Sequence, residues 1–256
     1  MKEELFFTHL LNKYFGGIAS RILSALGAHP IAAGEKSQHL FTYNPAAPIT
    51  NFFAMEILVA LILVALFIWA RARLSVDRPP AIQHVFELAE EFVNHQSEEI
   101  IGHHSQRFTP FLVALGLFIL FANLIGLVPG FESPTATPVV PLGLAIVAWV
   151  YYHWEGVKKQ GLLKYAKHFT GPMPVLAPLM IPIEIVSHLA RMMSLTIRLY
   201  ANMYAGDLVT MVFFSLIPIG VPVIFLGLHV FVSMLQAYIF VLLATVYLAG
   251  AVAEEH

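Results

Sequence analysis

The sequence predicts an all-α polytopic membrane protein with about five membrane helices, the last two a long, strongly tilted hairpin, and with amphipathic helices on the membrane surface. Two observations predict this class. Of the 256 residues, 58% are hydrophobic and 12% are charged, whereas a soluble domain has about 25% charged residues. Apolar segments that match the ~30 Å hydrocarbon core also recur along the chain. The net charge of −2 gives no sign of nucleic-acid binding, and the lack of cysteine excludes disulfides and thiolate metal sites.

Residues 1–48 are expected to form an N-terminal amphipathic helix and a polar connector. Apolar residues recur about once per helical turn up to Leu26, and Gly27 is expected to end the helix. Charged and polar residues interrupt this segment, so it lacks the clean apolar region of a signal peptide. A signal peptide cleaved after Ala28 is the alternative. Residues 49–256 are expected to form one membrane domain.

The first span is predicted over 51–72, because Phe52 to Ala70 is an uninterrupted apolar run that Asn51 is expected to cap. By the positive-inside rule, the arginines that follow place its end in the cytoplasm and the N-terminus outside. These arginines are Arg71, Arg73 and Arg78.

Residues 80–101 are predicted to form an amphipathic helix on the cytoplasmic surface rather than a span. An apolar stripe runs along this helix, and five glutamates lie off the stripe. The adjacent His103 and His104 follow it, but no third ligand stands at metal-site spacing, so we expect no metal site and no cofactor.

Two further spans are predicted over 108–128 and 138–156. The loop between them contains no lysine or arginine, which agrees with an external position. Four lysines follow the second of these spans and place its end in the cytoplasm: Lys158, Lys159, Lys164 and Lys167.

The last two helices are predicted over 174–217 and 221–253, with a turn at Pro218–Pro222. A helix of about 40 residues is ~60 Å long, twice the hydrocarbon core, so it has to be strongly tilted or bent. A long oblique helix can follow the outside of a cylinder, which indicates a curved partner. By parity the C-terminus is cytoplasmic.

A polar stripe runs along the first of these two helices. Its members are spaced four, three, four, three and four residues apart, so they share one helical face. A guanidinium at the bilayer centre costs about 2.5–3.5 kcal/mol, so such a line has to face water, protein or an opposite charge. Intramembrane charges of this kind indicate an ion or substrate path, although a structural role stays open for Arg191 near the helix end. The stripe comprises Glu184, His188, Arg191, Leu195, Arg198 and Asn202.

The last helix carries a second polar face, formed by His229, Ser233 and Gln236. If the hairpin turns at Ile219, a residue of one helix lies at the same height as a residue of the other when their numbers add up to about 438. This register predicts a titratable station, in which Asp207 lies beside His229, near the turn. It also predicts a deeper station where the fixed charge of Arg198 lies about one turn from Gln236. A static interhelical pair is the alternative for Asp207 and His229.

The motif SLTIRLYANMYAGD resembles that of subunit a of the F-type ATP synthase membrane sector. The closing segment HVFVSMLQAYIFVLLATVYLAGAVAEEH resembles the last helix of that family, and LFILFANLIGLVPG resembles its middle hairpin. The likeness extends from about Asn44 to the end of the chain.

The resemblance implies a non-catalytic stator subunit of the bacterial inner membrane that couples proton flow to ring rotation and ATP synthesis. Its partners would be the c-subunit ring, the b-subunit peripheral stalk and the rest of the synthase. Arg198 would face the carboxylate of the ring. Five other residues would line or bound two proton half-channels, and His188, Arg191 and Ser233 are further candidates. The five are Glu184, Asn202, Asp207, His229 and Gln236.

Two other function classes compete with this interpretation. An anion transporter that uses Arg198 as a substrate clamp would need internal repeats, and the sequence has none. An intramembrane hydrolase that uses Ser194 or Ser233 with His229 would need a strained, glycine-flanked nucleophile, which neither serine has. The sequence contains no phosphate-binding G-x-x-x-x-G-K-[ST] motif, so we expect nucleotide to bind to partners. The choice between H⁺ and Na⁺ stays open at this stage.

Overall fold

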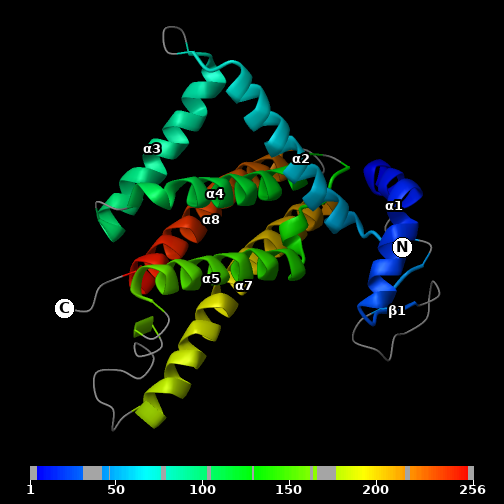
Figure 1. Cartoon of the computed structure of the whole chain (residues 1–256). Coiled ribbons are helices and arrows are strands. Elements are labelled where there is room, and N and C mark those ends of the chain that lie inside the picture. The colour runs from blue at the N-terminus through cyan, green and yellow to red at the C-terminus, as the bar shows by residue number, and fades with distance from the viewer. Residues whose placement is uncertain are drawn as a thin grey trace.

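The fold is all-α, as predicted, and is described here from a computed structural model (Figure 1). The structure describes residues 5–30, 42–45, 47–75, 79–102, 105–128, 130–161, 164–165, 177–216 and 220–252. Two two-residue strands, β1 (His29–Pro30) and β2 (Thr42–Tyr43), pair in the N-terminal connector. The long helices are α1 (Phe6–Ala25), α2 (Asn51–Ala72), α3 (Ala81–Ile101), α4 (Thr109–Leu124), α5 (Val139–Gln160), α7 (Ala177–Leu216) and α8 (Val221–Val252).

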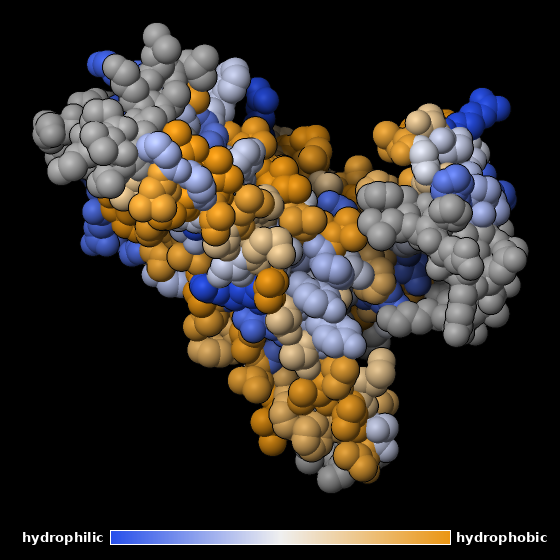
Figure 2. All heavy atoms as spheres, turned by 90° about the horizontal axis from the view of Figure 1, so that it is seen from below, coloured by the Kyte–Doolittle hydropathy of each residue, from blue (hydrophilic) through white to orange (hydrophobic). Residues whose placement is uncertain are grey.

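Four of the described helices are long and apolar enough to cross a membrane. They are α2, α4 with the 3-10 turn that follows it, α7 and α8. Helix α5 has 22 residues and packs against α7 and α8, but its last turns carry Glu155, Lys158 and Lys159 and it is not among the four. Figure 2 shows hydrophobic side chains over much of the face seen from below, which suits contact with lipid.

Helix α8 lies at the centre of the bundle, in contact with α3, α4, α5 and α7. The core is built from buried apolar side chains such as Leu112, Leu199 and Phe240. A Cβ on Gly116 of α4 would lie 2.8 Å from Cγ2 of Val241, so this glycine allows α4 and α8 to approach closely. Small residues at contacts of this kind are the usual means of packing membrane helices.

The end of α5 is fixed to the end of α8. Lys159 donates through Nζ to the carbonyl of Val252 at 3.0 Å, and Gln160 donates to that of Ala251 at 3.1 Å. Helix α5 ends at Gln160, four residues beyond the predicted end at 156. The next residue, Gly161, has a φ of 82°, which ends the helix.

The start of α2 differs from the prediction. Thr50, not Asn51, caps the helix, because the Thr50 hydroxyl accepts the amide of Phe53 at 3.4 Å. The Asn51 side chain instead accepts the amide of Leu5 at 3.3 Å and so holds α1 against α2. In sequence both residue types are good caps, and the path of α1 decides between them.

The predicted apolar stripe of α1 is exposed in the structure, as an interfacial helix requires. Phe6, Tyr14 and Ile18 are among its exposed members. His103 and His104 lie outside the described residues.

Candidate functional site

Helices α7 and α8 pack in the predicted hairpin register. Three contacts join residues whose numbers add up to 438. They set the level of every polar side chain on the two helices. The contacts are the Asn202–Gln236 hydrogen bond at 2.8 Å, the Phe213–Phe225 ring stack at 4.3 Å and the Arg191 guanidinium 5.4 Å from the Tyr247 ring centre.

Asp207 and His229 are in contact, as this register predicts. Nδ1 of His229 lies 3.8 Å from Oδ1 of Asp207. The imidazole side chain is only 4% exposed and the carboxylate 39%, so the pair joins a buried base to an acid that reaches the surface. Gly206 allows this arrangement, because a Cβ there would lie 2.7 Å from Nδ1 of His229. Nε2 of His229 is buried without a partner among the described residues.

A cavity of about 340 Å³ lies between α7 and α8 beside this pair. Asn202, Thr210 and His229 give it polar walls, while Val209 and Phe225 are among its apolar ones. Most of its walls are apolar, but these polar side chains give water molecules hydrogen-bond partners inside it. It extends from the level of His229 to Asn202, one turn from Arg198, and so connects the titratable pair to the middle of the stripe.

Arg198 lies half-buried on α7. Within the part of the chain that the structure describes, its guanidinium has no hydrogen-bond or ion-pair partner. Gln236 is fully buried and accepts a hydrogen bond from Asn202, so the amide partner of Gln236 is Asn202 and not Arg198. Asn202 is level with Gln236, and Arg198 lies one turn away, as the register predicts.

Within the described structure, Ser233 makes no hydrogen bond to Asp207 or His229. It is fully buried, its hydroxyl lies 3.9 Å from Sδ of Met203, and its carbonyl accepts from Asn123 at 3.4 Å. Asn123 also accepts the Thr135 hydroxyl at 2.7 Å. Ser233 therefore belongs to a packing contact between α4, α7 and α8, and in the described structure it makes no hydrogen bond to His229, as a hydrolase would need.

The other end of the stripe forms a second polar cluster. His188 is buried, with Nε2 3.3 Å from Glu184 and Nδ1 2.9 Å from the Tyr152 hydroxyl. Tyr152 and His153 of α5 carry no sequence signal of a site, because they lie in an aromatic run that is typical of a buried core. His153 lies edge-on to His188 at 4.7 Å between ring centres.

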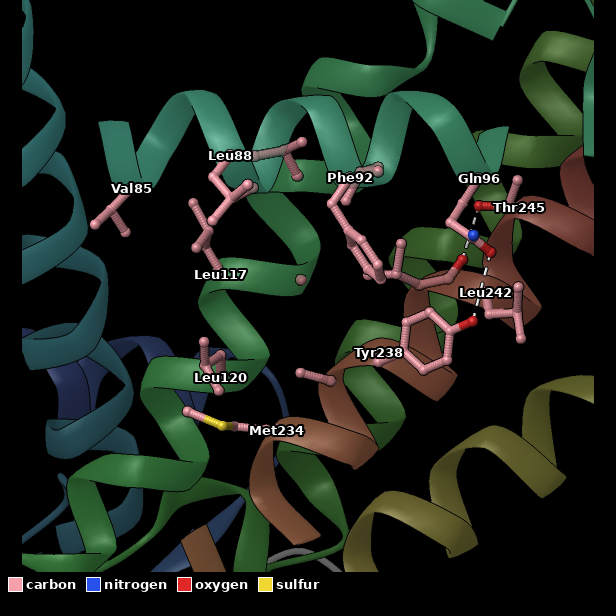
Figure 3. Close-up of a pocket in the computed structure, with 16 residues that line it drawn as sticks. Val85, Leu88, Phe92, Gln96, Leu117, Leu120, Met234, Tyr238, Leu242 and Thr245 are labelled. Atoms are coloured by element: carbon pink, nitrogen blue, oxygen red, sulfur yellow. Dashed lines mark hydrogen bonds between the residues drawn. The ribbon is translucent and has the colours of Figure 1, made fainter. Parts of the chain in front are cut away.

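A second cavity, of about 570 Å³, lies elsewhere, between α3, α4 and α8 (Figure 3). Its walls are mostly apolar, with Leu88, Leu117 and Met234 among them, and its polar side chains include Gln96 and Tyr238, which bond to each other at 3.4 Å. It contains no carboxylate or imidazole that could exchange protons. The chemistry therefore points to the smaller cavity as the functional one.

Comparison with known proteins gives one consistent result. The family described as ATP synthase A chain matches residues 53–249. The chain is 52% identical over all 256 residues to the ATP synthase subunit a of Koribacter versatilis, covering the full length of both. It is 59% identical over 229 residues to that of Solibacter usitatus, with 89% of this chain and 98% of the relative covered. The chain belongs to the family of ATP synthase subunit a, a membrane subunit of the bacterial enzyme.

Proposed function

We propose that this chain is the stator of a rotary proton motor, with two aqueous half-channels that meet at Arg198. In this function Arg198 faces an ionisable carboxylate on a rotating ring of c subunits. Protons neutralise that carboxylate from one half-channel and leave by the other. Ring rotation is coupled to ATP synthesis on other subunits, and this chain is not itself the catalyst.

The proposal depends mainly on one observation, the lack of a described counter-charge beside the Arg198 guanidinium. A half-buried guanidinium in a membrane helix is costly unless it has a counter-charge, and no described residue supplies one. The missing negative charge therefore has to come from a partner. Arg keeps its charge at any accessible pH, so it attracts an ionised carboxylate and prevents protons from passing straight through.

The polar groups between Arg198 and the hairpin turn support a half-channel on that side. Asp207 is partly open to the surface, His229 is buried behind it, and the cavity extends to Asn202. A carboxylate and an imidazole can each accept and release a proton, as a path of this kind requires. Gln236 holds Asn202 in place beside the path. Glu184 lies on the other side of Arg198 and fits the second half-channel.

The shape of α7 supports a curved partner. Its 40 residues give a length of ~60 Å, so it crosses the membrane obliquely and can follow the outside of a ring. We further propose that the protein lies in the bacterial inner membrane with its N-terminus outside and its C-terminus in the cytoplasm. The b subunits of the peripheral stalk would hold it against the rotation of the ring.

The test is Arg198→Ala in the assembled complex, measured as ATP-driven acidification of inverted membrane vesicles. We expect coupled pumping to be abolished while the complex still assembles. Arg198→Lys should also fail, because lysine lacks the planar fork and can lose its proton in a desolvated site. Arg73→Ala is the matched control, because that guanidinium lies 5.3 Å from the Trp69 ring centre, at the exposed end of α2 and away from the polar stripe. Normal acidification by Arg198→Ala would refute the assignment.

A further inference from the structure

We propose that His188 relays protons between the Tyr152 hydroxyl and the Glu184 carboxylate, on the opposite side of Arg198 from the Asp207–His229 pair. The inference rests on the proposed function and assigns residues to its second half-channel. It adds a group from α5, Tyr152, to a path otherwise formed by α7 and α8.

Two carboxylate–imidazole pairs flank Arg198. Nε2 of His188 lies 3.3 Å from Glu184, and Nδ1 of His229 lies 3.8 Å from Asp207. In each pair the imidazole is buried, with 11% and 4% of its side chain exposed, while the carboxylate is 30% and 39% exposed. A path from the protein interior to water needs this order of a buried carrier followed by an accessible acid.

The two pairs also lie on opposite sides of Arg198 along α7, each more than two helical turns away. Asp207 lies nine residues after Arg198 and His188 lies ten residues before it. At helical rise these separations are about 14 and 15 Å. Neither pair can therefore form a direct ion pair with Arg198 along the helix.

Both ring nitrogens of His188 are in position to transfer a proton. When Glu184 is ionised it can only accept, so Nε2 of the neutral ring carries the hydrogen. Nδ1 is then the acceptor for the Tyr152 hydroxyl at 2.9 Å. The ring thus lies in series between an uptake group on α5 and a release group on α7.

The transfer balances in protons and charge. The Tyr152 hydroxyl takes up a proton from the path in the same step in which it passes its own to Nδ1, so no tyrosinate is left behind. The imidazolium releases its Nε2 proton to Glu184, which loses it to water. A flip of the neutral ring restores the starting tautomer, so one proton has entered and one has left.

The groups around His188 come from three helices. On α7, Glu184 and Arg191 are charged, and the Arg191 guanidinium lies over Tyr247 of α8. On α5, the His153 ring lies edge-on to His188, and its Nδ1 donates to the carbonyl of Trp149 at 2.9 Å. The remaining titratable neighbours are Tyr152 and, against the His153 ring, Tyr165. Among the described residues, the groups beside the relay thus include one carboxylate, one fixed cation and several aromatic rings.

The test is proton flux in inverted vesicles that contain the whole complex, measured across pH for His188→Ala. Loss of a proton-transfer group should lower the flux about tenfold or more. Millimolar imidazole buffer should restore part of the flux, because a small imidazole can replace the missing carrier, whereas it cannot repair a packing defect. The matched control is His95→Ala, which removes a His–Glu pair at the same spacing, 3.4 Å apart, on the exposed face of α3. That variant should keep normal flux.

A second variant keeps the proposal testable if His188→Ala assembles poorly. Tyr152→Phe preserves the buried ring and removes only the hydroxyl, and it should also slow the flux. The double variant should lose no more than His188→Ala alone, because the two groups act in series.

Normal flux in His188→Ala or in Tyr152→Phe would overturn the relay. A loss in fully assembled His188→Ala that imidazole does not restore would overturn it as well, and so would losses that multiply in the double variant. These results differ from a failure of the proposed function. If Arg198→Ala abolishes pumping while both relay variants are normal, only the relay is wrong. If Arg198→Ala pumps normally, the proposed function itself is wrong.

Discussion

Gly206 sets the distance between α7 and the His229 ring, so Gly206→Ala should disturb the Asp207–His229 pair. The new methyl carbon would lie 2.7 Å from Nδ1 and 2.9 Å from Cε1 of His229. Ordinary contacts start near 3.4 Å, so the ring or the helix has to move by roughly 0.7 Å. The ring is buried but borders the cavity of about 340 Å³, so it can move into that space and away from its present contact.

The expected magnitude follows from two opposing effects. Overpacking a buried contact costs about 1–3 kcal/mol. Replacing glycine by alanine within a helix returns about 1 kcal/mol. The net effect on stability is therefore small, at most about 2 kcal/mol, whereas the 3.8 Å contact to Asp207 is lost or lengthened. We expect assembly close to normal and proton flux reduced several-fold.

Gly227→Ala is the matched control. Gly227 lies in α8 two residues before His229, and a Cβ there meets nothing within 4 Å. The Gly227→Ala variant gains the same helix propensity as Gly206→Ala but introduces no close contact with another side chain. The assay is ATP-driven and passive proton flux in vesicles, normalised to the amount of assembled complex. Equal flux for Gly206→Ala and Gly227→Ala would refute the role of the close approach.

Two further predictions concern ion pairs. The double variant Asp207→His, His229→Asp should retain more proton flux than either single variant, because the Asp207–His229 pair then still consists of one carboxylate and one imidazole. Flux losses of the two single variants that simply multiply in the double variant would argue against a shared station. The second concerns Glu155, a buried carboxylate whose ion-pair partner is the half-exposed Arg107. Arg107→Gln should lower the free energy of unfolding of the purified complex by about 1–3 kcal/mol. This loss is smaller than the loss from breaking a fully buried ion pair. Adding Glu155→Gln should recover part of the loss, and no recovery would contradict the pairing.

Much of the architecture could be predicted from sequence because the bilayer restricts the options. Apolar length identifies a span, since every backbone polar group in lipid has to be satisfied within a helix. The 40-residue length of α7 follows from the lack of a turn signal between its ends. The Asp207–His229 contact followed from the position of the hairpin turn, because two antiparallel helices of equal rise fix the level of each residue.

Only the tertiary structure decided which neighbours the polar groups have. It paired Gln236 with Asn202 rather than with Arg198, and it left Arg198 without a partner in the described part of the chain. It also brought Tyr152 of α5 to His188, 36 residues apart in sequence. Periodicity gives the face of one helix, but not how a second helix is rotated against it. That rotation is set by close-packed side chains and by glycines such as Gly206, whose meaning appears only when the opposite helix is in place.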